Sequence, residues 1–495
     1  MYLMKGEMIM SESKIRITTS GMSIVPYEKK QCPHLENMTS MKDFGCKFRR
    51  IETTGFNLGD RFVTHHLPKF FLENYFGAYD IEYVPANKYT KIPKDINWDM
   101  SEDIELRSDQ FSVVNSILQD IKHNRWFVHC PQGFGKTLVS IYIMTQFRVN
   151  TMVMCYSVEI LKQWKKRISE DTNIDMSRVL IIDDSQILKN IIDDEFPVEK
   201  FNIFLATPTM INSIGKKISY DKMNLLFQKM NIGLKIYDEA HRNLGNMIKI
   251  DASTSVKYTL YLSGDFAQAG KYRTALFQRM FDDVIKVKPD MSESPNLKYT
   301  QAIVVEYNSH PSEMDIMQIQ TRRGMSIWNF MDYQIQKGKL LEVIDWIIDH
   351  IISLKERDRR ILLLTSKVDH CEYLYRHIKT RYDHHYVGIY HGEIDQDTME
   401  DTKNNAQIII ATYSSFSTGI DTKNIKYVIS SSASNRIEDS QASGRARPLP
   451  NGEDCFFWML VDTGFEHLAQ KEKERVDYLY QLKVKEVTRI SYDLI

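Results

Sequence analysis

The sequence predicts an α/β fold in which two doubly wound domains, each built on a parallel sheet, follow a small N-terminal α+β module. Short, continuously apolar runs alternate with amphipathic stretches of helical length in both halves of the chain. This alternation is typical of buried parallel strands covered by helices. The stretch 289–311, rich in Pro, Ser and Asn, separates the two halves. Residues 1–100 are rich in aromatic residues and lack the alternation, which indicates a separate module.

The strand-like runs of the two halves resemble each other in length and composition. Those of the first half are Trp126–Cys130, Thr151–Tyr156, Val179–Asp183, Asn202–Ala206, Leu234–Tyr237 and Thr259–Ser263. Those of the second half are Arg360–Thr365, Tyr386–Tyr390, Gln407–Thr412, Tyr427–Ser431 and Cys455–Leu460. Because each run is followed by a stretch long enough for a helix, we expect both sheets to be parallel.

The ends of the two sheet domains are less sharply marked than their strands. One further strand-like run, 299–307, lies within the stretch that separates the halves, and residues 465–483 have the apolar spacing of a helix. We therefore expect these parts: an N-terminal accessory module at 1–100, a first sheet domain at 101–288, a linker at 289–325, a second sheet domain at 326–464 and a C-terminal helix at 465–495.

Composition excludes several classes of protein. The chain of 495 residues is 43% hydrophobic and 26% charged, as in an ordinary globular protein. No apolar run approaches the roughly 18 residues of a membrane span, and the first residues lack the apolar core of a secretory signal. Six scattered cysteines without a Cys-x-x-Cys pair argue against a disulfide framework. We expect a cytoplasmic protein that is neither secreted nor bound to a membrane.

Charge neither favours nor excludes a nucleic-acid partner. The formal net charge is −1, but a nucleic-acid-binding protein can confine its positive charge to a cleft. One predicted helix carries a basic face, which fits a solvated surface and a phosphate contact equally well. Its residues are Lys162, Lys165, Lys166 and Arg167.

The N-terminal module contains potential metal ligands and a basic, aromatic stretch. The cysteines and histidines match no standard zinc spacing, so we favour core or surface roles for them. They are Cys32, His34, Cys46, His65 and His66. Basic residues at 47–50 and aromatic residues at 70–76 are compatible with a nucleic-acid surface. An aromatic core with solvated charges is the favoured interpretation.

The first strand-like run leads into a glycine-rich turn and then into an apolar helix. The turn, 131–137, reads Pro-Gln-Gly-Phe-Gly-Lys-Thr. A turn through Gly133, Phe134 and Gly135 lets backbone N–H groups point at phosphates, and the helix N-terminus adds its positive end. In such a loop the lysine, Lys136, reaches the β- and γ-phosphates, and the hydroxyl of Thr137 binds Mg²⁺. The alternative is a chance glycine-rich turn; the strand–loop–helix context favours a site for a nucleoside triphosphate and Mg²⁺.

An acidic tetrapeptide follows the strand-like run Leu234–Tyr237. Its first residue, Asp238, stands where a carboxylate holds Mg²⁺ in phosphoryl-transfer enzymes, and Glu239 can polarise the attacking water as a general base. Ala240 and His241 complete the tetrapeptide. A solvated acidic loop is the alternative. Because ligands bind at the carboxyl edge of open α/β sheets, the acidic tetrapeptide and the phosphate loop together predict one site.

With these motifs in place, residues 104–465 resemble superfamily 2 DExH-box (DEAH-box) helicases, whose two lobes are RecA-like domains. Leu106–Gln110 is similar to an element whose glutamine contacts adenine, so the resemblance implies that role for Gln110. The stretches 157–164 and 206–209 resemble elements that contact the nucleic-acid backbone. The resemblance implies this contact for Gln163, Thr207 and Thr209.

The second half carries the motifs expected of the second lobe. Residues 411–421 closely match the motif that contacts both nucleic acid and nucleotide. The resemblance implies backbone contact by Thr412, and nucleotide contact and interdomain coupling by Gly419 and Asp421. Leu362–Ser366 and 390–392 match the earlier motifs of this lobe.

An arginine-finger motif follows at 441–448, which resembles Gln-x-x-Gly-Arg-x-x-Arg. It implies nucleotide contact by Gln441. The second arginine falls one place early, at Arg447, and Pro448 stands in its usual position. The choice of finger between Arg445 and Arg447 therefore stays open. In the first lobe, Ser263 matches the first position of a Ser-Ala-Thr-like coupling motif, and the third position does not match.

The resemblance implies an ATP-dependent helicase or translocase with ATP and Mg²⁺ as cofactors. Catalysis is expected from Lys136, Asp238, Glu239 and one arginine of the second lobe. DNA or RNA as the track, polarity and true unwinding stay open. One alternative is a catalytically weak nucleic-acid-binding clamp or scaffold, and the presence of Lys136, Asp238, Glu239 and Arg445 argues against it. The other is a P-loop ATPase that acts on proteins, and the Gln110 element and the motif at 412–421 argue against it.

The narrower resemblance is to phage recombination-type and poxvirus transcript-release helicases. It is carried by the string 416–421 followed by the arginine-finger motif, and by the phosphate loop and Ile160–Trp164. It implies a viral, phage or plasmid protein in a host cytoplasm. We expect a monomer, with transcription or replication machinery as further partners.

Overall fold

The computed structural model describes most of the chain between residues 84 and 492. The described ranges are 84–130, 134–264, 284–288, 299–321, 324–337, 339–356, 359–416, 424–431, 453–481 and 484–492, the single residues 281, 422 and 442, and short N-terminal strands. The chain divides into two compact units, with the boundary after Pro289. Among the described residues, no helix is long and apolar enough to cross a membrane.

The first unit is built on a seven-stranded sheet in the order β10-β11-β9-β12-β13-β8-β14. All its strand pairs are parallel. Its strands are β8 (Arg125–His129), β9 (Asn150–Met154), β10 (Val179–Ile182), β11 (Ile203–Ala206), β12 (Ile232–Tyr237), β13 (Tyr258–Ser263) and β14 (Ile285–Val287). Its helices are α3 (Ser108–Gln119), α4 (Lys136–Phe147), α5 (Val158–Asp171), α6 (Ser185–Ile192), α7 (Pro208–Lys217), α8 (Tyr220–Lys229) and α9 (Leu244–Ser253).

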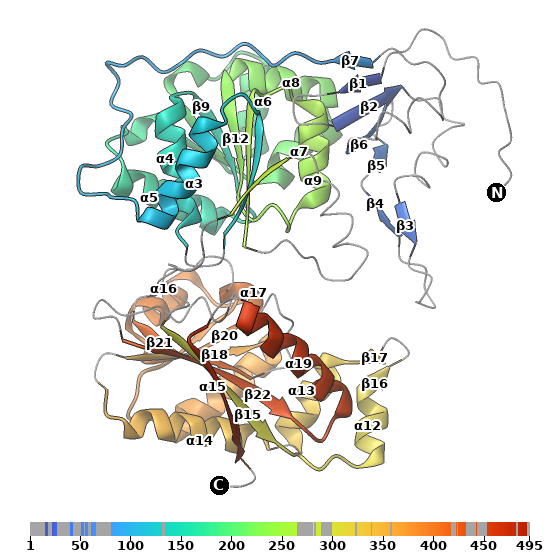
Figure 1. Cartoon of the computed structure of the whole chain (residues 1–495), viewed down its shortest axis with the longest axis vertical. Coiled ribbons are helices and arrows are strands. Elements are labelled where there is room, and N and C mark those ends of the chain that lie inside the picture. Colours follow the sequence, from blue (N-terminus) through green and yellow to red (C-terminus); the bar gives the residue numbers. More distant parts are fainter. Residues whose placement is uncertain are drawn as a thin grey trace, which may run out of the picture. The chain divides into compact units, whose positions relative to one another are not determined.

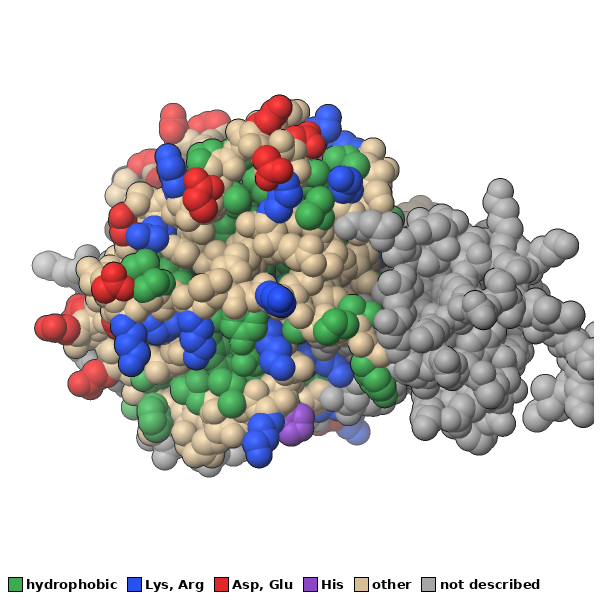
Figure 2. Space-filling view, turned by 90° about the horizontal axis from the view of Figure 1, so that it is seen from above, with side chains coloured by type: hydrophobic (Ala, Val, Ile, Leu, Met, Phe, Trp, Pro, Cys, Tyr) green, Lys and Arg blue, Asp and Glu red, His purple; other side chains and the backbone are tan. Residues whose placement is uncertain are grey.

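Helices cover both faces of this sheet, as the apolar strands require. Side chains alternate between the two faces of a strand, so Phe127 joins a core with α6, α7, α8 and α9, while Trp126 and Val128 are buried on the opposite face. Figure 1 shows α3, α4 and α5 on that opposite face. The face of the molecule in Figure 2 carries both basic and acidic side chains, in keeping with a net charge near zero.

Two small sheets precede the first unit's main sheet. One has the order β5-β6-β2-β1-β7 and the other pairs β3 with β4. Their strands are β1 (Ile15–Ile17), β2 (Met22–Pro26), β3 (Ser40–Lys42), β4 (Ile51–Thr53), β5 (Gly55–Asn57), β6 (Arg61–His65) and β7 (Ile81–Tyr83). Residues 84–100, which the sequence analysis places in the N-terminal module, lie against the main sheet domain. The buried Trp98 indole, for example, donates to the Met144 carbonyl of α4 at 3.2 Å.

The second unit has its own seven-stranded parallel sheet, in the order β19-β20-β18-β21-β22-β15-β23. Its strands are β15 (Thr300–Tyr307), β18 (Arg360–Thr365), β19 (Val387–Tyr390), β20 (Ile408–Thr412), β21 (Ile425–Ser430), β22 (Cys455–Asp462) and β23 (Glu486–Ser491). Its helices are α12 (Glu313–Ile319), α13 (Ile327–Gln336), α14 (Leu340–Ser353), α15 (Val368–Arg381), α16 (Gln396–Asn405), α17 (Tyr413–Phe416) and α19 (Glu466–Gln481). A short hairpin, β16 (Gln320–Thr321) with β17 (Gly324–Met325), separates α12 from α13.

Residues 300–307, which the sequence analysis assigns to the linker, form β15 inside the second sheet. β15 pairs with β22 on one side and with β23 on the other. Polar residues such as Gln301 and Glu306 interrupt the apolar run, and they are half-buried within the sheet. The region 465–495 contains β23 in addition to the expected helix, so it contributes an edge strand to this sheet.

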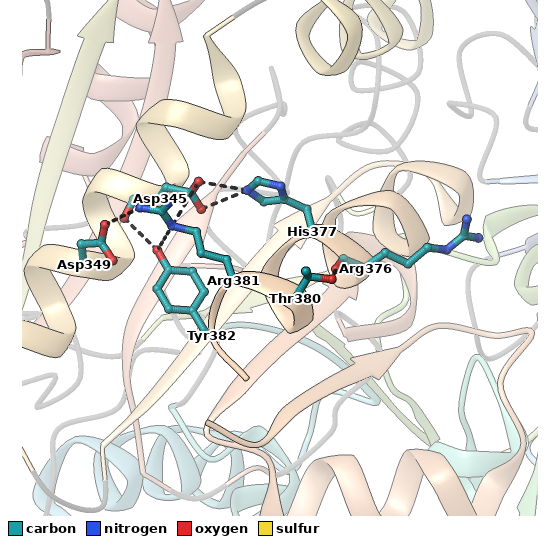
Figure 3. Close-up of polar contacts among 7 residues, drawn as sticks. All are labelled: Asp345, Asp349, Arg376, His377, Thr380, Arg381 and Tyr382. Atoms are coloured by element: carbon teal, nitrogen blue, oxygen red, sulfur yellow. Dashed lines mark hydrogen bonds and ion pairs between the residues drawn. The ribbon is translucent and has the colours of Figure 1, made fainter. Parts of the chain in front are cut away.

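A polar cluster joins α14 to α15 on one face of the second sheet (Figure 3). The buried carboxylate of Asp345 lies 3.0 Å from Nε2 of His377 and 3.4 Å from Nε of Arg381. Arg381 also reaches Asp349, at 2.9 Å. Since these partners lie one turn apart on each helix, the cluster fixes the register of the two helices.

Candidate nucleotide and nucleic-acid site

Gly135 forms the end of the glycine-rich turn and the N-cap of α4. Its φ of 91° lies in the left-handed region that favours glycine. A Cβ at this position would clash with the side-chain amide nitrogen of Gln110. Gln110 is buried, and its Oε1 accepts from the backbone N–H of Arg107 at 3.1 Å. The fold thus brings the predicted adenine-contacting residue against the phosphate loop. Phe134, within the same turn, is buried, and Gly133 lies outside the described residues.

Lys136 and the acidic tetrapeptide lie together, as the sequence predicts. The Lys136 ammonium is 3.1 Å from Oε1 of Glu239 and donates to the Cys130 carbonyl at 3.4 Å. The lysine is buried. Thr137, the next residue of α4, is half-buried. Two elements with four strands, β9 to β12, between them in the chain therefore form one charged cluster at the carboxyl edge of the sheet.

The acidic tetrapeptide is held by the strands on either side of it. The N–H of Asp238 donates to the Met154 carbonyl, and that of Ala240 donates to the Leu262 carbonyl, both at 2.9 Å. Between them, Glu239 adopts a φ of 49°. A left-handed backbone at a residue other than glycine is sparsely populated and persists where the surrounding structure enforces it.

The two carboxyl groups have opposite electrostatic environments. Burial and the neighbouring Glu239 raise the pKa of Asp238, against the opposing effects of the Trp164 N–H and Lys136. Burial also disfavours the charged form of Glu239, but the positive charges of Lys136, His241 and Arg242 outweigh it and lower its pKa to about 2. Glu239 is therefore ionised at neutral pH, in close contact with the lysine.

Trp164 is a site residue that the sequence analysis missed. Its buried indole N–H donates to Oδ2 of Asp238 at 2.9 Å. Trp164 belongs to the apolar stripe of α5 together with Ile160, Leu161 and Ile168, so its spacing alone favours a core role. A buried indole N–H usually finds an acceptor, and that requirement was the available signal. The predicted Gln163 lies half-buried one residue earlier.

His241 connects the acidic tetrapeptide with the end of the neighbouring strand. Its Nδ1 lies 2.8 Å from Oγ of Ser263 and 3.2 Å from Oε2 of Glu239. Ser263, the matching residue of the coupling motif, ends β13 and is fully buried. The structure thus brings these three residues together, with a hydrogen bond between His241 and Ser263 and an ion-pair contact between His241 and Glu239.

Thr207 and Thr209 lie at the carboxyl end of β11, on the same sheet edge. The Thr207 hydroxyl caps α7 by accepting from the N–H of Met210 at 3.1 Å. Thr209 is exposed, and its hydroxyl accepts from the Asn246 amide at 3.2 Å. Both remain predicted nucleic-acid contacts.

In the second unit, Thr412 ends β20 and is buried. Its hydroxyl accepts from the N–H of Ser415 at 3.3 Å and so caps α17. Thr365, which ends β18, is its partner in the parallel register. The other predicted residues of this lobe lie outside the described residues: Gly419, Asp421, Gln441, Arg445 and Arg447.

The donor set of the first unit fits a magnesium nucleotide. Asp238 and Thr137 carry oxygen atoms of the kind that Mg²⁺ prefers as ligands. Within the described ranges, no group of three or more His, Cys, Asp and Glu side chains could hold a metal by itself. The side chains of Cys32, His34, Cys46, His65 and His66 lie outside those ranges. The described cysteines are free and buried, and burial raises the pKa of the Cys130 thiol to about 12.

Comparisons with known proteins match both units. The family described as "Type III restriction enzyme, res subunit" matches residues 103–267, and the family described as "Helicase conserved C-terminal domain" matches residues 342–447. The "ATP-dependent DNA helicase uvsW" of Enterobacteria phage T4 is 26% identical over 52% of this chain and 52% of its own length. The "Transcript termination protein A18" of Yaba-like disease virus is 22% identical over 68% of each chain.

The fold also matches a solved structure. The DEAD-box helicase Mss116 bound to ssRNA and UDP-BeF has a TM-score of 0.54 at 14% identity, over 78% of this chain and 75% of that chain. The match shows a shared fold. The chain spans about half the length of the phage relative and 24% of the length of other curated relatives.

Proposed function

We propose that the chain is a superfamily 2 helicase that acts as an ATP-dependent nucleic-acid translocase or helicase. The observation that carries the proposal is the contact between Lys136 and Glu239, at 3.1 Å, beside Asp238 and Gln110 at one sheet edge. A scaffold protein has no need to keep a phosphate-loop lysine, a metal-binding carboxylate and a general base together.

Lys136 and Glu239 exchange partners in the proposed reaction. In the structure the ammonium neutralises the carboxylate, so Glu239 is a weak base. When Lys136 turns to the β- and γ-phosphates of ATP, the pKa of Glu239 rises and the carboxylate can accept a proton from the attacking water. Asp238 and Thr137 would hold Mg²⁺, which neutralises charge on the phosphates.

The second lobe would complete the site. From the sequence motifs, we assign nucleotide contact to Gln441, Gly419 and Asp421, and the arginine finger to Arg445 or Arg447. An arginine that reaches the γ-phosphate from another lobe couples closure of the lobes to hydrolysis. His241 and Ser263 are placed to transmit that change within the first unit, because they link Glu239 to the end of β13.

Nucleic acid would be held mainly through its sugar–phosphate backbone, by Gln163, Thr207 and Thr209 in the first lobe and Thr412 in the second. Such contacts carry no sequence information and weaken with salt. The phage relative is named a DNA helicase, and the solved Mss116 structure holds ssRNA, so both tracks are candidates. The same proposal includes a setting and partners. The protein would come from a virus, phage or plasmid and act in the host cytoplasm as a monomer, with transcription or replication machinery as further partners.

Phosphate release from ATP, measured with single-stranded DNA, single-stranded RNA, duplex or no nucleic acid, tests the proposal. We expect at least one nucleic acid to stimulate turnover, and we expect Lys136→Ala to abolish it without changing the circular dichroism spectrum. Turnover that no nucleic acid stimulates would favour an ATPase that acts on proteins. Nucleic-acid binding without turnover would favour a clamp.

A further inference from the structure

Helix α13 presents an indole to solvent on a face of the second unit. The side chain of Trp328 is 60% exposed, whereas Phe330 and Met331 on the same helix are buried. Neighbouring elements hold the helix: Asp332 is 2.8 Å from Nε2 of His370 on α15, and Asn329 donates to the Gln318 carbonyl at 2.9 Å. Trp328 is therefore an exposed aromatic residue on a fixed support.

A lysine lies over the Trp328 ring. The ammonium of Lys367 is 5.3 Å from the ring centroid, which is cation–π distance. The lysine side chain is 28% exposed, and its ammonium lies 3.7 Å from the exposed carboxylate of Asp369. One face of the surface thus combines an aromatic plane with a positive charge that is available to a phosphate.

The position of this pair within the sheet points to its ligand. Lys367 precedes α15 and follows β18 by two residues, and β18 ends at Thr365, the register partner of Thr412. The Trp328–Lys367 pair therefore lies at the same carboxyl edge as Thr412, the residue assigned to backbone contact in this lobe. A nucleic-acid strand that binds at Thr412 and continues along this edge of the sheet would reach Trp328 and Lys367 without leaving the second unit.

We propose that Trp328 stacks on a base of single-stranded nucleic acid while Lys367 contacts an adjoining phosphate. This inference rests on the proposed function, since it refines the nucleic-acid path of the same enzyme. Aromatic stacking is tolerant of sequence because every base has a π-face, and it accompanies basic grooves that follow the backbone. The Lys367 charge beside the ring distinguishes this surface from an apolar protein-docking face.

Binding of labelled oligonucleotides to the full chain, followed by fluorescence anisotropy, tests the inference. Two probes of equal length and charge are compared: oligothymidylate and an abasic strand. Trp328→Ala should weaken binding of oligothymidylate roughly 10-fold and leave binding of the abasic strand unchanged. Trp328→Phe should restore most of the affinity. Lys367→Ala should weaken binding of both probes and lower the salt slope by about 1.

Two controls keep the result interpretable. Tyr480→Ala removes another exposed aromatic side chain of the second unit, 58% exposed on α19, and should leave both affinities unchanged. ATP turnover without nucleic acid should be the same in Trp328→Ala and the unmodified chain, because Trp328 is not part of the ATP site. If Trp328→Ala also alters basal turnover, its loss of binding is attributed to misfolding. The affinity of Trp328→Phe for oligothymidylate, which should be close to that of the unmodified chain, then tests the inference in its place.

Three outcomes would overturn the inference. An unmodified chain that binds neither probe removes the proposed function and this inference together. Full oligothymidylate affinity in Trp328→Ala removes the inference alone and leaves the proposed function standing. Equal losses on the oligothymidylate and abasic probes show that the indole does not stack on a base.

Discussion

The Trp164 indole and the Asp238 carboxylate meet at 2.9 Å, although the two residues are 74 positions apart in the chain. The family resemblance implied a nucleic-acid contact for Gln163, whereas the apolar spacing of α5 predicted a core role for its neighbour Trp164. Linear spacing cannot reveal a donor and an acceptor that only the sheet brings together. The phosphate loop and the acidic tetrapeptide could be predicted because each motif is local.

Trp164→Phe should slow ATP turnover about 10-fold, because it keeps the packing and removes a hydrogen bond to a charged group, typically about 1.5–3 kcal/mol. Loss of the donor should raise the pKa of Asp238 further, so the acid limb of the rate profile moves to higher pH. The Mg²⁺ concentration for half-maximal rate should also rise. Initial rates against pH and Mg²⁺ measure both effects.

Trp126→Phe is the matched control for that experiment. Trp126 is equally buried, on β8 of the same sheet, and its indole nitrogen has no hydrogen-bond partner among the residues that the structure describes. Its rate, pH profile and Mg²⁺ dependence should match those of the unmodified chain. If the two variants behave alike, the Trp164 hydrogen bond does not position the carboxylate.

His129 makes the stability of the first unit sensitive to mild acid. Burial and the positive charges of Lys288 and Lys136 lower its pKa from 6.5 to about 4. Between about pH 6.5 and pH 4, His129 is therefore protonated in the unfolded chain and neutral in the folded chain. The free energy of unfolding falls as the pH drops through this window, by about 3 kcal/mol at most. Glu239 acts in a lower window, because its pKa moves from 4.5 to about 2.

Urea unfolding of the full chain between about pH 7 and pH 4.5 measures this effect. In His129→Gln, which cannot titrate, the dependence on pH across this window should be flatter than in the unmodified chain. An identical pH dependence in both proteins would contradict the assignment to His129.

At the scale of elements, the strands with continuous apolar runs were predicted to within two residues of their ends. β14 and β23 were not predicted, because each is short or interrupted by charged residues and lies at a sheet edge. β15 was recognised as a run but placed in the linker, since the adjacent stretch is rich in Pro and Ser. A continuous apolar run is enough to predict a strand from sequence. Whether a strand that also contains polar residues belongs to a sheet depends on partner strands far away in the chain.

The strand that carries the acidic tetrapeptide is tied to α9 by a buried ion pair. Nζ of Lys235 lies 2.5 Å from Oδ1 of Asp251, and both side chains are fully buried. The hydroxyls of Tyr237 and Tyr261 donate to the same carboxylate at 2.7 Å and 2.6 Å. The network holds β12 and β13 in a fixed position relative to α9.

Asp251→Ala should lower the free energy of unfolding by about 3–5 kcal/mol, because it leaves a buried ammonium without its counter-charge. Asp349→Ala serves as the comparison: it breaks an ion pair with Arg381 in which both side chains are about half exposed, so we expect at most about 1 kcal/mol. Urea unfolding of the two variants measures both. Equal losses would show that the buried pair does not stabilise the first unit.

At the scale of the whole molecule, the resemblance to superfamily 2 and its phage and poxvirus members is confirmed by the family matches and by the two viral relatives. The α/β fold with two parallel sheets is confirmed as well. The nucleic-acid track could not be predicted from charge, which is −1 overall; it was inferred from motifs on the two sheet edges. The arginine finger remains assigned from sequence, as Arg445 or Arg447.

Movement along nucleic acid is the central claim, and displacement of streptavidin from a biotinylated strand tests it most directly. The unmodified chain should displace streptavidin from DNA or RNA only when ATP and Mg²⁺ are present. Glu239→Gln, which lacks the general base, should bind the strand and displace nothing. Displacement that does not need ATP, or ATP turnover stimulated by a strand without any displacement, would contradict the account.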